Sequence, residues 1–142
     1  MQHVEVARRF DAPVHRVWER YTDHRGWTEW AGLGRVTLDP AGSPDPNGVG
    51  CVRKITTASL SVWEEVVDFE PERRMTYRLV RGAVPMRNHF GEVRFDPDGT
   101  GTRVVWRCRF DSMIPGLGWL LRRGVERMFA DVLARLERRG GL

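Results

Sequence analysis

Between residues 51 and 110 the chain reads as a succession of strands joined by very short connections, and this feature limits its possible folds most. The strand-like segments are CVRKITT, SVWEEVVDF, RMTYRLV, NHFGEVRF and TRVVWRCRF, and the connections between them are ASL, EPER, GAVPM and DPDGTG. Because connections this short join antiparallel neighbours, the pattern predicts an antiparallel meander. The last strand alternates most clearly, with Val104, Trp106, Cys108 and Phe110 on one face and mainly arginine on the other.

A long amphipathic helix is predicted after the strands, from about Pro115 to Arg139, with Gly140-Gly141 ending it. Upstream, HVEVARRF predicts a first strand, DAPVHRVWERYTD and HRGWTEW predict two short helices, and GRVTLDP predicts a further strand. The apolar stripe of the long helix needs a partner, and the apolar strand face is the largest one left. We therefore predict an α+β fold in which a curved antiparallel sheet of about seven strands surrounds the C-terminal helix.

Length and charge narrow the class of protein. The 142 residues suit a single domain spanning 1-142. The chain contains no apolar run long enough to span a membrane and no signal-peptide pattern, which predicts a cytoplasmic protein. The net charge is +4, but the arginines are spread along the chain and mixed with acidic residues. This distribution favours a solvated surface over a nucleic-acid interface.

Signatures of common catalytic and cofactor sites are missing from the sequence. There is no nucleophile elbow, no Walker loop, no GxGxxG and no CxxC, and the histidines are scattered. We therefore predict no metal site and no cofactor. Cys51 and Cys108 lie on strands several neighbours apart in a meander, so we expect free thiols.

Three segments carry a resemblance to a known family: DAPVHRVWERYTD in the first helix, EEVVDFEPERRMTYRL across two strands, and GTRVVWRCRF before the long helix. They resemble the START/Bet v 1-like (SRPBCC) superfamily, and more narrowly the polyketide cyclase/dehydrase and lipid transport family. The resemblance implies a helix-grip fold whose cavity binds apolar small molecules, with a minority of members acting as cyclase-aromatases. Plant abscisic-acid receptors share this layout, and two of their pocket positions resemble Glu65 and His89 here.

Counting back from the hairpin turns predicts which side chains face the helix. A three-residue turn at Ala58-Ser59-Leu60 would place Arg53 opposite Glu65. Glu65 also shares the more apolar face of its strand with Trp63, Val67 and Phe69, which predicts that it points inward. Such a pair of opposite charges could orient a ligand or simply hold two strands together. Both interpretations remain open at this stage.

The other inner-face candidates come from the last three strands. The apolar alternation of RMTYRLV places Tyr77 inward, and pairing of Phe95 with Thr102 would place Gly91 beside Trp106. A glycine beside a large indole predicts either a gap filled by the ring or the border of a cavity. His89 is the only inward candidate that titrates near neutral pH, and it is a weak candidate for catalysis.

The leading hypothesis is a binding or carrier protein, with a cavity under Trp106 that Met128 of the long helix borders. Trp63, Tyr77, Trp106, Phe110 and Met128 would supply apolar contact, while Arg53, Glu65 and His89 would orient the ligand. The loops AGSPDPNGVG and RGAVPMRN would flank the opening. We expect a monomer or a weak homodimer.

Two further hypotheses stay open. The first is a polyketide cyclase or dehydratase that uses His89, Tyr77 or Arg53, with an acidic acyl carrier protein meeting the arginines of the last helix. The second is an interaction module with a filled core and no ligand.

Overall fold

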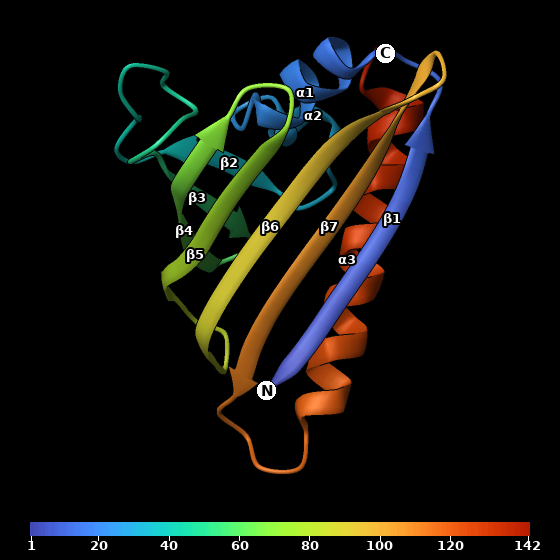
Figure 1. The fold of residues 1–142 in the computed structure, drawn as a ribbon. Helices are drawn as coiled ribbons and strands as arrows, with labels where there is room; N and C mark the ends of the chain where they lie inside the picture. The colour runs from blue at the N-terminus through green and yellow to red at the C-terminus, as the bar shows by residue number, and fades with distance from the viewer.

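A computed structural model describes residues 1–142 and contains three helices and one seven-stranded sheet (Figure 1). In chain order the elements are β1 (Gln2–Phe10), α1 (Val14–Thr22), α2 (Trp27–Trp30), β2 (Arg35–Leu38), β3 (Val52–Thr57), β4 (Leu60–Glu70), β5 (Arg74–Gly82), β6 (Met86–Asp98), β7 (Gly101–Ser112) and α3 (Gly118–Arg139). The predicted α+β helix-grip fold is confirmed. None of the helices has the length and apolar character needed to cross a lipid bilayer.

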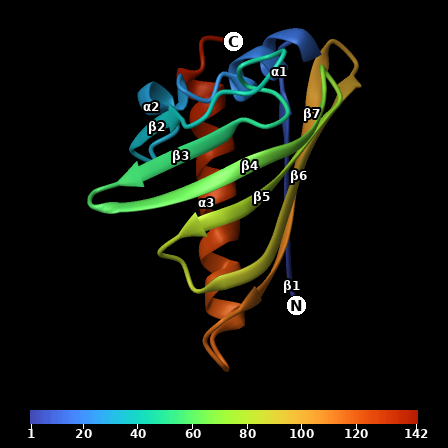
Figure 2. The same cartoon turned by 90° about the vertical axis from the view of Figure 1, so that its left-hand side faces the viewer.

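The sheet is antiparallel throughout, in the order β1-β7-β6-β5-β4-β3-β2. Neighbours in this order are neighbours in sequence except at one end, where β1 pairs with β7 and Gln2 lies opposite Phe110. The strands curve across one side of α3 (Figure 2). The inner face of the sheet and the apolar stripe of α3 therefore bury each other.

The β3–β4 hairpin differs from the sequence prediction by one residue. Its turn has two residues, Ala58 and Ser59, and Thr57 pairs with Leu60. Ala58 takes the left-handed conformation, with a φ of 55°, that a tight hairpin turn requires. Because side chains alternate along a strand, a shift of one residue exchanges the two faces of β4. The prediction that Arg53 lies opposite Glu65 is therefore wrong, and Arg53 pairs with Glu64.

Irregularities in β4 explain why its apolar pattern was misleading. The β4–β5 ladder shifts register between Trp63 and Glu64 and again between Val66 and Asp68. Val66 is buried on the inner face, and after the second shift Phe69 also turns inward, where its ring packs 5.1 Å from that of Trp18. The inner residues therefore change from even to odd numbers along one strand, as expected at a β-bulge.

The β6–β7 hairpin keeps its predicted faces but not its predicted register. Its turn is Gly99-Thr100, so Phe95 pairs with Val104 instead of Thr102. A shift of two residues leaves every side chain on its predicted face. Gly91 consequently lies beside Cys108 on β7 and Tyr77 on β5, and its predicted position beside Trp106 is wrong.

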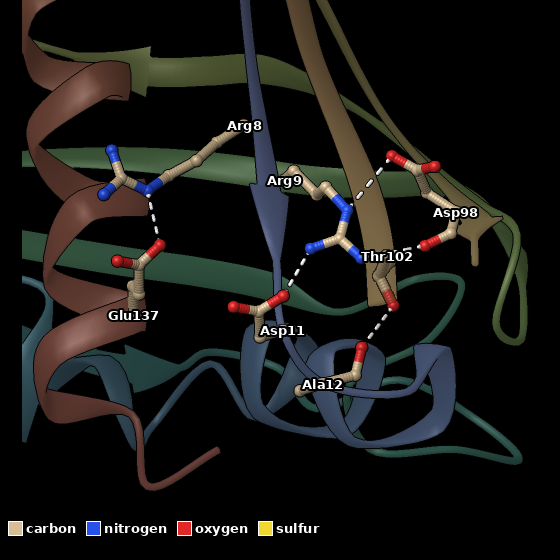
Figure 3. Close-up of polar contacts among 7 residues, drawn as sticks. All are labelled: Arg8, Arg9, Asp11, Ala12, Asp98, Thr102 and Glu137. Carbon is tan, nitrogen blue, oxygen red and sulfur yellow. Dashed lines mark hydrogen bonds and ion pairs between the residues drawn. The ribbon is translucent and has the colours of Figure 1, made fainter. Parts of the chain in front are cut away.

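The C-terminal half of α3 anchors the helix to the sheet. The buried residues of α3 are Phe129, Val132, Leu133 and Leu136, all beyond its midpoint. Near the same end, Arg8 of β1 donates a 3.0 Å hydrogen bond to Glu137, and Thr102 of β7 donates to the carbonyl of Ala12 (Figure 3). The helix begins at Gly118, later than predicted, because Gly116 takes a φ of 79° that interrupts a helix.

Helices α1 and α2 close the same end of the molecule with aromatic side chains. Tyr21, Trp27 and Trp30 are buried, and the ring of Tyr21 lies 5.2 Å from that of Trp27 and 5.4 Å from that of Trp106. Edge-to-face contacts of this kind add to the stability gained from burial. This aromatic cluster fills the end of the fold that lies near the C-terminus of α3 (Figure 1).

Candidate functional site

A cavity of about 440 Å³ lies between the inner face of the sheet and the first half of α3. Of its 22 lining residues, 16 are hydrophobic. The helix side of the lining consists of Leu120, Leu121, Gly124, Val125, Met128 and Phe129. This spacing of three to four residues turns one continuous stripe of α3 toward the cavity. Residues of the β5–β6 connection, Ala83 and Val84, and Leu60 of the β3–β4 hairpin also contribute.

Trp106 and its neighbours form the inner wall of the cavity. The Trp106 ring stacks on Phe129, with centroids 3.9 Å apart and planes 7° from parallel. Its Nε1 donates a 2.7 Å hydrogen bond to the hydroxyl of Tyr77. The Tyr77 ring in turn covers Gly91, where a Cβ would lie 2.3 Å from a ring atom. Gly91 therefore makes room for Tyr77, and the stack gives the inner wall a fixed shape.

An ion pair between Arg53 and Glu64 lies on the β3–β4 side of the cavity. Nε of Arg53 lies 2.9 Å from Oε1 of Glu64. The guanidinium carbon is 4.7 Å from the ring centroid of Trp27 and 4.5 Å from that of Tyr77, so two aromatic rings pack against the cation. Burial lowers the pKa of Arg53, but the carboxylate of Glu64 opposes this and the net pKa is raised. The guanidinium therefore keeps its charge.

His89 occupies an irregular part of β6, next to Asn88 with its φ of 54°. The backbone N–H of Leu79 donates a 3.0 Å hydrogen bond to Nδ1 of His89. Because Nδ1 is the acceptor, the proton of the neutral ring lies on Nε2. Burial lowers the pKa of His89, and the charge of Arg53 adds to the effect, although Glu64 opposes it. The ring is therefore neutral at pH 7.

Three further buried polar side chains, those of His24, Cys51 and Tyr21, do not line the cavity. Nδ1 of His24 lies 3.7 Å from Sγ of Cys51, and the hydroxyl of Tyr21 has no hydrogen-bond partner. Burial, reinforced by the charge of Arg53, holds the pKa of His24 well below its usual range. Burial also raises the pKa of the Cys51 thiol to about 11 and that of Cys108 to about 12, and both are free thiols.

Five of the predicted site residues meet at the cavity, and three lie elsewhere. Those that line it are Arg53, Tyr77, His89, Trp106 and Met128. Trp63 faces outward between Lys54 and Arg81, and Glu65 forms an exposed ion pair with Arg78. Phe110 is fully buried in the core and does not reach the cavity. The inward positions predicted for Trp63 and Glu65 are wrong because register shifts break the apolar alternation of β4, and Glu64 lines the cavity instead.

Sequence reasoning missed Glu64 and Trp27, which hold Arg53 in place. Glu64 follows directly from the correct turn, since it replaces Glu65 when the register moves by one residue. Trp27 lies in α2, and no sequence pattern relates this short helix to a strand so distant along the chain. Of the two loops expected at the opening, RGAVPMRN contributes Ala83, Val84 and Met86, whereas no residue of AGSPDPNGVG lines the cavity.

Solved structures with this fold come from several bacteria. The Zhui aromatase/cyclase of Streptomyces sp. R1128 superposes with a TM-score of 0.79 at 21% identity, over 98% of this chain and 93% of its own. A Thermobifida fusca protein solved by NMR has a TM-score of 0.82 at 24% identity, over 99% and 94%. DynU16 from the dynemicin biosynthetic locus has a TM-score of 0.74 at 21% identity, over 97% of this chain but 46% of its own.

These identities support a shared fold. Among curated proteins, none matches the sequence. The family model described as polyketide cyclase / dehydrase and lipid transport, by contrast, matches residues 1–141, nearly the whole chain. Together with the helix-grip fold and a cavity under the long helix, this match shows that the chain belongs to the polyketide cyclase/dehydrase and lipid transport family.

Proposed function

We propose that this protein binds a mainly apolar small molecule in the cavity between the sheet and α3. The observation that carries the proposal is the cavity itself, with about 440 Å³ of space and 16 hydrophobic residues among the 22 that line it. Sites for small molecules commonly measure about 300–1,000 Å³ and combine apolar walls with a few polar groups. The alternative of an interaction module with a filled core does not account for this space.

Gly124 offers a direct test, because it lies in the middle of the α3 lining and a Cβ there would meet nothing within 4 Å. In Gly124→Leu the new side chain should occupy the cavity without displacing its walls. We expect the affinity for Nile red, an uncharged apolar dye, to fall at least about tenfold relative to the unmodified protein. The measurement is a fluorescence titration of the dye.

Gly124→Ala is the matched control. It should bind Nile red as the unmodified protein does and gain about 0.5–1 kcal/mol in unfolding free energy, since alanine is the better helix former. Equal dye affinity in the leucine and alanine variants would contradict binding at this site. Native mass spectrometry of the freshly purified protein would then identify what it retains.

A second candidate function is cyclisation or dehydration of a poly-β-keto chain. The observation that favours it is the neutral His89, which lines the cavity and carries its proton on Nε2 because Nδ1 accepts from Leu79. A neutral imidazole can exchange a proton with a bound enol. The substrate would arrive on an acidic acyl carrier protein, and Arg123 and Arg127 are exposed on α3 without an ion pair.

Turnover separates the two candidates. A poly-β-keto thioester incubated with the protein should give a cyclised product, and His89→Gln should lose that product while still binding Nile red. A protein that binds the dye but converts no thioester would leave binding as the function.

A further inference from the structure

The charged groups at the cavity are arranged so that the negative one is the more accessible. Arg53 is 1% exposed, whereas the Glu64 side chain is 15% exposed, and both border the cavity. The two form a neutral pair, but the carboxylate is the more accessible of the two charged groups. This part of the cavity wall is therefore more negative than positive, because Arg53 is almost fully covered and Glu64 is not.

Arg53 keeps only one guanidinium nitrogen, Nη2, that is neither bonded to the protein nor buried. Its Nε is bonded to Glu64, and the rings of Trp27 and Tyr77 pack against its guanidinium. Its Nη1 is buried without any partner, so that atom points into the protein. Because Nε is bonded to Glu64 and Nη1 is buried, only Nη2 is left, and the guanidinium cannot offer a second carboxylate N–H groups from two neighbouring nitrogens.

Glu64 keeps one free oxygen. Arg53 bonds to Oε1, and no other group of the protein donates to the carboxylate. Oε2 is therefore an acceptor at the cavity wall. Such an atom in a mostly apolar cavity favours a ligand that brings a hydroxyl or enol proton to it.

Two uncharged donors also lie near this ion pair. His89 presents Nε2–H, because its Nδ1 accepts from Leu79. The hydroxyl of Tyr77 accepts from Trp106, which leaves its own proton for another acceptor. One anionic acceptor and two neutral donors therefore lie along the same wall.

We propose that this wall selects uncharged ligands that carry a hydroxyl or enol group, with Glu64 as the residue that determines specificity, and that it excludes carboxylates. The inference rests on the proposed binding function and names its ligand class. A ligand hydroxyl would donate to Oε2 of Glu64, and an adjacent carbonyl would accept from His89. A ligand carboxylate would instead lie beside a carboxylate in a weakly solvated cavity, and like charges in such surroundings repel.

Three bicyclic compounds of similar size test the proposal: naphthalene, 2-naphthol and 2-naphthoate. Their affinities are measured near pH 7, where the naphthol is neutral and the naphthoate ionised, by displacement of Nile red. We expect 2-naphthol to bind more tightly than naphthalene, and 2-naphthoate to bind at least about tenfold more weakly than 2-naphthol.

Two isosteric variants assign the effect to one residue. Glu64→Gln removes the carboxylate and leaves the charge of Arg53 unopposed, so 2-naphthoate should gain at least about tenfold in affinity while 2-naphthol loses a few-fold. Glu65→Gln changes the adjacent residue, which pairs with Arg78 on the outer face, and should leave all three affinities unchanged.

Two outcomes would overturn the proposed selectivity, and a third would contradict binding itself. Preferential binding of 2-naphthoate by the unmodified protein would make Arg53 the anchor and overturn the proposal, as would an unchanged order in Glu64→Gln. If that variant does not fold, Glu64→Asp keeps the charge and must keep the discrimination against 2-naphthoate. Absence of binding by Nile red and by all three compounds would instead contradict the proposed function.

Discussion

Two neutral histidines lie close to a buried cation in this molecule. His24 is fully buried beside Cys51 and within the field of Arg53, and His89 is partly buried against Tyr77. For both, burial is the main reason that the pKa is lowered, and the charge of Arg53 acts in the same direction. Protonation of either ring would place a second positive charge near the guanidinium.

The lowered pKa values predict that acid destabilises the fold. The unfolded chain takes up protons on these histidines near pH 6.5, and the folded chain does so only at lower pH. Stability from this source is therefore complete above about pH 6.5 and falls as the pH drops, by at most about 1.4 kcal/mol per pH unit for each histidine. Denaturant unfolding between pH 7.5 and 5 measures the slope.

His24→Gln isolates the contribution of the more deeply buried ring. This variant should show a smaller loss of unfolding free energy between pH 7.5 and 5 than the unmodified protein. His15→Gln, at an exposed position of α1, should retain the full slope. Identical slopes in all three proteins would show that His24 becomes protonated equally readily in the folded and unfolded chains.

The two halves of α3 make different contacts. Its buried residues begin at Phe129, and its end is tied to β1 by the bond from Arg8 to Glu137 (Figure 3). The first half lines the cavity, and near its start Trp119 and Leu120 are 52% and 53% exposed. Gly124 further weakens this half, because glycine has the least helix propensity after proline.

Hydrogen exchange should therefore divide the helix near its midpoint. Backbone amides from 120 to 127 should exchange faster than those from 130 to 137, since local opening is cheapest where few apolar contacts are lost. Saturation with Nile red should slow the first group and leave the second unchanged. Uniform protection along α3, measured by NMR or mass spectrometry, would show that the whole helix opens as one unit.

The elements could be predicted from sequence more fully than the contacts between them. Alternation in β7 and the apolar stripe of α3 are repeated signals, and an error at one residue does not change them. The face of β4, in contrast, depends on whether the turn before it has two or three residues, and Ala58-Ser59-Leu60 contains no glycine or asparagine to mark it. That single residue decided whether Glu64 or Glu65 lies opposite Arg53.

Several of the cavity residues could be predicted from the sequence, but the aromatic residues that close one end of the fold could not. Tyr77, Trp106 and Met128 could be placed at the cavity because each lies on an element with a clear inner face. Trp27 could not, because α2 has only four residues and its position depends on the fold as a whole. Aromatic residues of α1 and α2 fill one end of the fold, and the other end keeps space for a ligand.

The position of β1 at the end of the sheet, with β7 as its only neighbour, has a consequence for how the chain is made. The ribosome releases β1 first, and its pairing partner follows only after the other strands, about a hundred residues later. At about 5–20 residues per second, β1 waits roughly 5–20 s without a ladder. During that time its alternate apolar side chains, including Val4 and Phe10, have no sheet to cover them. The nascent chain therefore carries an unpaired strand, open to association with other chains, until β7 emerges.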